Sequence, residues 1–247
     1  MIEISDDIKN DYTMGGQISI CDLWFDVSST RQYYTYSVEA VNNFIKKANN
    51  KEDTHYLYTD QWLYSAIEKY PIRGDSTLII GSEEPCYEGV AIAYGATVTT
   101  LEYQKIISEH PLLKTTTIDE FCTDNTIFDS VISISSIEHS GLGRYGEALD
   151  PNGDIKIMET IYNRLKNGGI CFLAVPIGID QILWNAHRVY GRRRLPLLIN
   201  KFKLIDSFGL SDSDYDVNEF AKRQIDNDIR KKGVNYGSHQ PILVLQK

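Results

Sequence analysis

From residue 77 onward, short apolar or β-branched runs alternate with segments of helical periodicity, and this alternation limits the fold more than any other feature of the chain. Helices are expected at 87–94 and 154–165. The runs themselves are predicted to be strands: 77–81, 97–101, 114–118, 128–137, 170–175, 202–207 and 241–245. Repeated β-α-β units with short connections predict an α/β fold, a doubly wound, mostly parallel, Rossmann-like sheet with helices on both faces.

The first 75 residues differ in character, because they are aromatic and polar and lack this alternation. Two helices are predicted there, one at 37–48 with Ser37 as its N-cap and one at 60–70 that ends before Pro71. We therefore expect an N-terminal helical and aromatic cover segment at 1–75, followed by a Rossmann-like domain at 76–247.

The composition argues against several classes of protein. The chain has 34 acidic residues against 25 Lys and Arg and a net charge of -9, so we expect no nucleic-acid partner, since such partners need a basic surface. The sequence has no run of about 18 apolar residues, so no transmembrane segment is predicted. Its acidic start lacks the features of a secretory signal. The four cysteines are scattered without CxxC spacing, which favours a reduced, cytoplasmic protein.

The loop after the first strand is the first candidate for chemistry, because ligands of open α/β sheets bind at the carboxyl ends of the strands. This loop reads GSEEPCYEG at 81–89. Gly81 permits a tight turn with the backbone close to a ligand. Glu83, Glu84 and Glu88 would repel a pyrophosphate at the start of the following helix. A ligand without phosphates and with a cationic centre therefore fits better than a dinucleotide.

Acidic residues follow the next two strands. Glu102 ends the second strand, about 20 residues after Gly81, where a carboxylate can accept both hydroxyls of a ribose. The alternative is a solvated carboxylate at a strand end, and the position relative to Gly81 favours the ribose. Asp119 follows the third strand, where it could contact an adenine amino group or simply cap a helix.

Several motifs together resemble the class I S-adenosylmethionine-dependent methyltransferases. Besides the first loop and the acid at 102, they are Phe128-Asp129 at the start of the fourth strand and KNGG at 166–169, which looks like the (L)KxGG turn of that superfamily. Three further segments resemble the signature of a small family within it, a domain of unknown function: SSIEHSGLGRYG at 135–146, DPNGD at 150–154 and WNAHRVYG at 184–191. The first loop departs from the usual GxGxG pattern.

The resemblance covers residue 75 to the C-terminus, and it implies a methyltransferase-type domain at 76–247 with S-adenosylmethionine as cofactor. Carboxylates near the cofactor would suit its positively charged sulfonium. The residues expected to bind the cofactor lie in the first loop, at the end of the second strand and after the third and fourth strands: Gly81, Ser82, Glu83, Glu102, Tyr103, Asp119 and Ser136.

The segment 138–154 follows the fourth strand, where an acceptor or the methyl group would be reached. His139 could take a proton from an acceptor hydroxyl, or it could pack beside the cofactor without taking part in the reaction. Arg144 and Tyr145 could hold the substrate. Glu138, Asp150 and Asp154 could bind a hard cation, but a turn at 150–153 is the stronger interpretation, and we expect no metal.

The segment 184–191 supplies further candidates, with His187 as the second candidate base and Arg188 and Tyr190 as substrate-binding residues. The stretch 188–203 holds basic residues and no acidic one: Arg188, Arg192, Arg193, Arg194, Lys201 and Lys203. Three interpretations stay open. The stretch could bind a phosphate-bearing acceptor, form a solvated face or a contact with a second subunit of a homo-oligomer, or contact an anionic membrane surface peripherally.

The first functional hypothesis is an S-adenosylmethionine-dependent methyltransferase that methylates an oxygen of a sugar or glycan precursor, as in polysaccharide biosynthesis, on a phosphate-bearing acceptor such as a nucleotide-linked or lipid-linked sugar. Two alternatives are kept. One is a catalytically silent Rossmann-like binding module. The other is a nucleotide-sugar-modifying enzyme, which the missing phosphate loop disfavours. Fold analogy alone does not decide among them.

Overall fold

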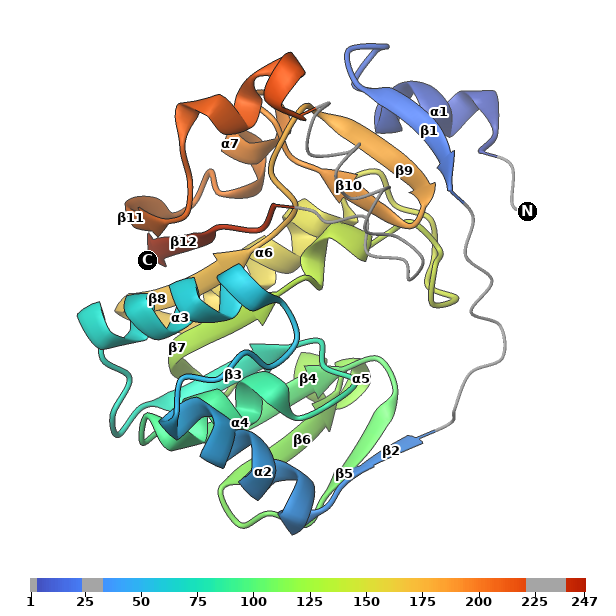
Figure 1. The fold of residues 1–247 in the computed structure, drawn as a ribbon. Coiled ribbons are helices and arrows are strands. Elements are labelled where there is room, and N and C mark those ends of the chain that lie inside the picture. Colours follow the sequence, from blue (N-terminus) through green and yellow to red (C-terminus); the bar gives the residue numbers. More distant parts are fainter. Residues whose placement is uncertain (1–3, 24–32, 221–238) are drawn as a thin grey trace.

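The computed structural model describes residues 4–23, 33–220 and 239–247. Its centre is a seven-stranded sheet in the order β11-β12-β8-β7-β3-β4-β6 (Figure 1). The strands, in chain order, are β3 (Ser76–Ile80), β4 (Thr97–Glu102), β6 (Leu113–Thr117), β7 (Phe128–Ile134), β8 (Leu165–Ala174), β11 (Lys203–Phe208) and β12 (Ile242–Gln246). The five strands from β6 to β8 are parallel, and β12 is antiparallel to both of its neighbours. The predicted doubly wound, mostly parallel sheet is confirmed.

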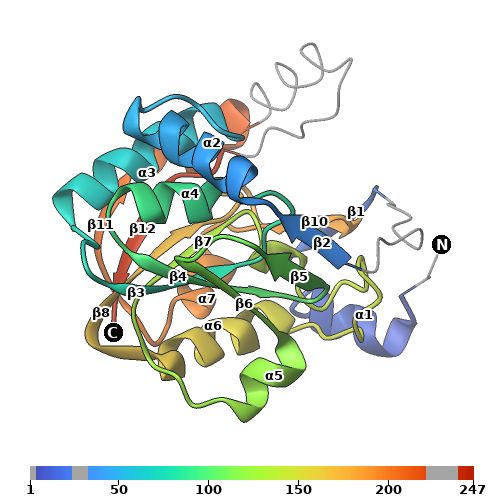
Figure 2. The same cartoon turned by 90° about the horizontal axis from the view of Figure 1, so that it is seen from below.

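Helices cover both faces of this sheet (Figure 2). One face carries α2 (Val38–Asn49), α3 (Leu57–Lys69) and α4 (Cys86–Ala93), and the other carries α5 (Ile118–Thr123), α6 (Gly153–Arg164) and α7 (Arg194–Leu198). Both helices predicted in the first 75 residues are present, and the hydroxyl of Ser37 caps α2 by accepting the Ala40 N–H at 3.1 Å.

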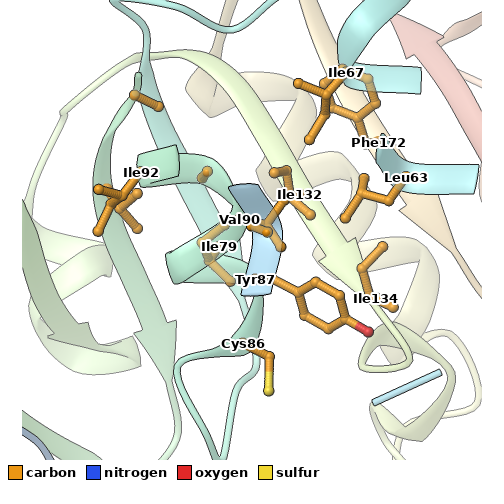
Figure 3. Packing of buried hydrophobic residues seen from close by; sticks show 14 of the residues in the cluster. Leu63, Ile67, Ile79, Cys86, Tyr87, Val90, Ile92, Ile132, Ile134 and Phe172 are labelled. Carbon is orange, nitrogen blue, oxygen red and sulfur yellow. The ribbon is translucent and has the colours of Figure 1, made fainter. Parts of the chain in front are cut away.

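The core consists of two apolar layers, because successive side chains of a strand point to opposite faces of the sheet. Leu78 of β3 packs in the layer under α5 and α6, and its neighbour Ile79 packs in the layer under α3 and α4. Figure 3 shows Ile132 of β7 between Val90 of α4 and Leu63 of α3. Both faces of the central strands are therefore buried, as their continuous apolar sequences require.

Two small sheets lie beside the central one and were not expected from the sequence. The first joins β1 (Ser19–Leu23), β9 (Gln181–Asn185) and β10 (His187–Val189), next to α1 (Asp6–Tyr12). The second pairs β2 (Tyr33–Tyr36) with β5 (Lys105–Ser108) in parallel. Segments near the N-terminus thus pair with segments 72 or more residues away, as with Tyr33 and Lys105.

The end of β7 differs from the prediction, and the difference determines where the residues after this strand lie. The expected strand 128–137 stops at Ile134, because Ser135 adopts a φ of 51°, in the left-handed region that non-glycine residues rarely occupy. The chain then forms the 3₁₀ turn η1 (Ile137–His139), and a second such turn, η2 (Asp212–Tyr215), follows β11. Within the described residues no helix has the length and apolar character needed to cross a membrane.

Candidate active site

A cavity of about 810 Å³ opens at the carboxyl ends of the parallel strands. Residues that follow β3, β4, β7 and β8 line it, among them Gly81, Tyr103, Ser136 and Pro176. The cavity therefore lies at the position where the strand order reverses, between β3 and β7, which is the ligand-binding position of open α/β sheets. Its volume is in the upper part of the range of about 300–1,000 Å³ typical of small-molecule sites.

The first loop turns sharply at Gly81 and lies directly against the end of β7. Gly81 has a φ of 69°, and a Cβ at this position would lie 2.1 Å from the hydroxyl oxygen of Ser136. Only glycine fits both conditions without a shift of its neighbour. Gly81, Ser82, Glu83 and Ser136, which the sequence singled out, all line the cavity.

Glu102 lies across from this loop at the end of β4. Its Oε2 accepts the Ser82 N–H at 3.0 Å, and its Oε1 accepts the Tyr103 N–H at 2.7 Å. Burial raises the pKa of Glu102, and these backbone donors oppose that rise. The N–H of Gln104 is a third backbone donor to this carboxylate. Since a carboxylate has about four acceptor positions, Glu102 can accept one more hydrogen bond, and Tyr103 lines the cavity beside it.

The side chain of Glu88 supports the first loop from inside the protein. It does not face a ligand at the start of α4, as the sequence suggested. Its carboxyl group is fully buried and accepts hydroxyl protons from Thr100 at 2.8 Å and from Ser82 at 3.1 Å. Burial raises its pKa to about 7. Glu88 thus fixes Ser82 rather than repelling a ligand.

Sequence reasoning missed the residues that close the cavity from the N-terminal side. Tyr34, His55 and Tyr56 line it, and the last two are held by Asp60 of α3. One oxygen of the buried Asp60 carboxylate accepts the N–H groups of Thr54, His55 and Tyr56 at 2.7, 2.9 and 3.1 Å. The aromatic composition of this segment was the available signal, but nothing local showed that it faces the sheet edge.

The strained Ser135 begins a hydrogen-bonded chain of cavity-lining residues. Its hydroxyl donates to Oε1 of Glu138 at 2.8 Å and accepts the side-chain N–H of Gln240 at 3.1 Å. Glu138 is 1% exposed, and its Oε2 has no hydrogen-bond partner in the described part of the chain. Burial raises the pKa of Glu138 to about 7. Sequence reasoning considered Glu138 only as a metal ligand.

His139 lines the cavity as expected, but as a weakly basic group. Its Nδ1 lies 2.6 Å from the carbonyl oxygen of Ala186, which only accepts, and 3.3 Å from Nη1 of Arg144, which only donates, so the shorter contact favours a proton on Nδ1. Nε2 lies 3.8 Å from Oε1 of Glu138. Burial, followed by the nearby charge of Arg144, lowers the pKa of His139 to about 3. The imidazole is therefore neutral at physiological pH.

Arg144, Tyr145 and His187, three other residues named from the sequence, are also brought to this cavity. The guanidinium of Arg144 lies 5.2 Å from the centre of the Tyr145 ring and donates to the Ala186 carbonyl at 3.1 Å. Glu147 fixes the loop that carries them, since its carboxylate accepts the N–H groups of Gly143 and Tyr145 at 2.8 and 2.9 Å.

The assignment of Arg188 and Tyr190 to the substrate pocket is wrong. Both are buried and neither lines the cavity. Arg188 donates to the carbonyl oxygens of Ser140 and Pro151 at 2.6 and 3.3 Å, and the Tyr190 hydroxyl donates to Asp154 at 3.0 Å. The carbonyl oxygens that accept from Nη1 and Nη2 of Arg188 tie the ends of the 138–154 segment to β10, while its Nε lies 3.7 Å from Asp154.

The basic stretch 188–203 does not form a common anion site. Arg194 is buried and makes two hydrogen bonds to Asp154, at 2.5 and 3.0 Å. Arg192 pairs with Asp212 at 3.3 Å, Lys201 pairs with Glu159 at 3.1 Å, and none of the six basic residues lines the cavity. The local excess of positive charge is compensated by acidic residues from other elements.

Asp119 does not fit either of its two interpretations. It is exposed in the first turn of α5, outside the cavity lining, and Thr117 caps this helix together with Glu120. As for metals, Asp154 is occupied by Arg194, and within the described residues no three His, Cys, Asp or Glu side chains are grouped to hold an ion.

The fold is shared with solved methyltransferase structures. The 1,6-didemethyltoxoflavin-N1-methyltransferase of Burkholderia thailandensis, crystallised with 1,6-didemethyltoxoflavin and S-adenosylhomocysteine, matches with a TM-score of 0.53 and 13% identity, over 84% of this chain and 86% of the other. SMU.776, complexed with SAH, matches with a TM-score of 0.51 and 12% identity, over 78% of this chain and 50% of the other. The chain therefore has the class I methyltransferase fold.

Sequence comparison adds the family. No curated protein matches the chain significantly. The family described as "Caenorhabditis protein of unknown function, DUF268" matches residues 74–247, which include the whole central sheet and the loops that line the cavity from β3 onward. The chain belongs to the DUF268 family.

Proposed function

We propose that this protein is an S-adenosylmethionine-dependent methyltransferase that acts on a small molecule held in the cavity. The observation that carries the proposal is the position of Gly81, Ser136 and Glu102, which meet at the carboxyl ends of β3, β7 and β4 inside one cavity. The methyltransferase structures with the same fold, crystallised with S-adenosylhomocysteine, support it.

The residues present fit the cofactor. The Glu102 carboxylate, with three backbone donors, can still accept a hydrogen bond from the ribose, and the glycine at 81 lets the loop backbone approach a ligand. The exposed carboxylates of Glu83 and Glu84 line the same part of the cavity and suit a cation. When bound, the cofactor would supply an electrophilic methyl group on a sulfonium.

For the acceptor we propose a hydroxyl of a sugar or glycan precursor, as in polysaccharide biosynthesis. The cavity also presents groups that accept hydroxyl protons or stack on a sugar ring, namely Tyr56, Ser135, Glu138 and Tyr145. Among the basic residues, Arg144 lines the cavity, whereas those of 188–203 do not. A phosphate on the acceptor is therefore not part of the proposal.

His139 and His187 are proposed as contacts of the acceptor. Since the pKa of His139 is lowered to about 3, its Nε2 is better suited to accept a hydrogen bond than to remove a proton. The catalytic contribution of the chain would come mainly from holding the acceptor oxygen in line with the methyl group.

The proposal is tested by incubating the protein with S-adenosylmethionine and a panel of free sugars, methyl glycosides and sugar nucleotides, and measuring released S-adenosylhomocysteine. We expect release above the rate without acceptor for members of the neutral sugar groups. Cofactor binding with no release for any acceptor would instead favour the silent binding module.

A further inference from the structure

We propose that the Ser135–Glu138 pair accepts the proton released by the acceptor hydroxyl, with Ser135 in contact with the acceptor and Glu138 as the final proton acceptor. The inference rests on the proposed function and assigns a role that the weakly basic His139 is less suited to fill. Its evidence is the position, the hydrogen bonds and the burial of these two residues.

Ser135 is placed to contact both the cavity and Glu138. It lines the cavity, and the turn at a φ of 51° directs its hydroxyl away from the β7 ladder. A non-glycine residue in this region is strained, and such strain is concentrated at functional sites. The hydroxyl proton is already donated to Glu138 at 2.8 Å, while Nε2 of Gln240 at 3.1 Å and the Tyr56 hydroxyl also contact the Ser135 oxygen. The acceptor hydroxyl would take the place of one of these two contacts, and the Ser135 oxygen would then accept its proton while the Ser135 proton passes to Glu138.

Of the two residues of the pair, Glu138 is the one that can hold the proton after transfer. It is 1% exposed, with Oε2 lacking a hydrogen-bond partner within the described residues. A buried carboxylate is disfavoured unless its charge is compensated, so taking up a proton relieves the burial cost. This is also the reason why its pKa lies near 7 rather than near 4.

The charged and titratable groups around Glu138 come from several elements. Nε2 of His139 lies 3.8 Å from Oε1, and the guanidinium of Arg144 lowers the pKa of Glu138. Arg188 donates to its backbone carbonyl at 3.4 Å, not to its carboxylate. The hydroxyl groups whose pKa values respond to the charge of Glu138 are those of Tyr56, Tyr145 and Tyr190. Arg144 is thus the cation that keeps the carboxylate ionised in part at neutral pH.

The step balances as follows. The acceptor oxygen forms a bond to the methyl carbon with its lone pair, the bond from carbon to sulfur breaks, and its electron pair stays on sulfur to give the neutral thioether of S-adenosylhomocysteine. The acceptor hydroxyl proton passes to the oxygen of Ser135, and the Ser135 proton passes to Glu138. The ionised carboxyl group is consumed and is regenerated by proton loss to solvent.

The test uses the full chain and the acceptor found in the sugar panel. For wild type, kcat is expected to rise with pH through about 7, since Glu138 must be ionised. Glu138→Gln and Ser135→Gly are expected to lower kcat by about 100-fold or more and to remove this pH dependence. Affinity for S-adenosylhomocysteine should stay within twofold in both.

Two features separate this role from a structural one. Glycine relieves the strain at position 135 and offsets the cost of the lost hydrogen bonds to Glu138 and Gln240, so Ser135→Gly should stay folded and bind S-adenosylhomocysteine while losing activity. Ser133→Ala is the matched control, because Ser133 lies on β7 two residues earlier and does not line the cavity. It should keep wild-type kcat.

A second readout needs no acceptor. Infrared difference spectra of wild type minus Glu138→Gln, recorded from pH 5 to pH 9, should show a protonated carboxyl band that disappears near pH 7. The inference is overturned by a band that is constant over this range, or by a Glu138→Gln enzyme that keeps the wild-type pH profile. Absence of S-adenosylhomocysteine binding to wild type would overturn the proposed function instead.

Discussion

At the scale of single residues, the shape of the cavity depends on positions where a change of a few side-chain atoms would disturb the packing or the hydrogen bonds. Gly81 is the clearest case, because it has no room for a side chain and a φ that other residues avoid. Glu102 is the second, because its two oxygens already organise the backbone of two loops and still face the cavity.

Gly81→Ala is expected to lower stability and to weaken cofactor binding together. The new methyl group would lie 2.1 Å from the Ser136 hydroxyl oxygen, in addition to the backbone strain at a φ of 69°. We expect a loss of unfolding free energy of about 2–4 kcal/mol by urea titration, from strain and overpacking. Calorimetry with S-adenosylhomocysteine should show at least tenfold weaker binding.

Gly74→Ala is the matched control for this prediction. Gly74 has a φ of 85°, but a Cβ there meets nothing within 4 Å. It should therefore lose only the strain energy, about 1–2 kcal/mol, and keep full affinity. Equal effects of the two substitutions on binding would show that the contact with Ser136 has no role in the site.

At the scale of elements, the segment 138–154 is held in place by a buried charged cluster. Asp154 of α6 receives Arg194 and Tyr190, while Arg188 reaches back to the carbonyl oxygens at both ends of the segment. Burial alone would raise the pKa of Asp154, but Arg188, Arg194 and Tyr190 together lower it. The cluster is thus a structural anchor of the loop that carries Arg144 and Tyr145.

Asp154→Asn is expected to destabilise the protein by about 3–5 kcal/mol, because it leaves two buried guanidinium groups without their carboxylate. The measurement is urea unfolding at neutral pH. Glu159→Gln, which removes the exposed partner of Lys201, is the control and should cost less than about 1 kcal/mol. A similar small loss for Asp154→Asn would mean that the cluster is solvated in solution.

The elements of the central sheet could be predicted from the sequence, because a strand buried on both faces must be apolar along its whole length. The runs at 77–81 and 170–175 gave β3 and the second half of β8 in this way. The small sheet of β1, β9 and β10 could not be predicted, since its short strands have mixed composition and depend on partners far along the chain.

The residues of the candidate site, like the elements of the fold, could be predicted only in part. Residues that directly follow strands, such as Gly81, Glu102 and Ser136, were found, because their place depends on the sheet alone. Arg188 was assigned wrongly, because the charge pattern around it contains no sign of the acidic partners from α6. The Ser135–Glu138 contact depends on a single unusual backbone angle, which no pattern of residues in 128–137 indicated.

At the scale of the whole molecule, stability should depend on pH through two buried glutamates. Burial raises the pKa values of Glu88 and Glu138 to about 7 from an ordinary value of 4.5. Between those values the two glutamates bind more protons in the folded state than in the unfolded state, so they make the unfolding free energy fall as pH rises. Their stabilising contribution is complete below about pH 4.5 and is lost by about pH 8. His139, with its pKa lowered to about 3, acts in the opposite direction below about pH 6.5, so the fall is steepest between about pH 6 and pH 8.

Glu88→Gln should remove part of this dependence. A pKa change from 4.5 to about 7 corresponds to about 3 kcal/mol at most. We expect the variant to lose less stability than wild type between pH 5 and pH 8, measured by urea unfolding. Glu109→Gln, at an exposed position, should behave like wild type. An unchanged pH dependence in Glu88→Gln would show that this carboxyl group is hydrated.

The most direct test of the proposed nucleoside site is calorimetric titration of S-adenosylhomocysteine into wild type and Glu102→Ala, with Glu109→Ala as the control. Wild type and control are expected to bind at micromolar concentration or tighter. Glu102→Ala should bind about 10- to 100-fold more weakly, since it loses the hydrogen bonding of the ribose to a charged group and the carboxylate that holds the backbone of the first loop. No binding to wild type, or equal affinity in Glu102→Ala, would contradict a nucleoside site at the carboxyl ends of β3 and β4.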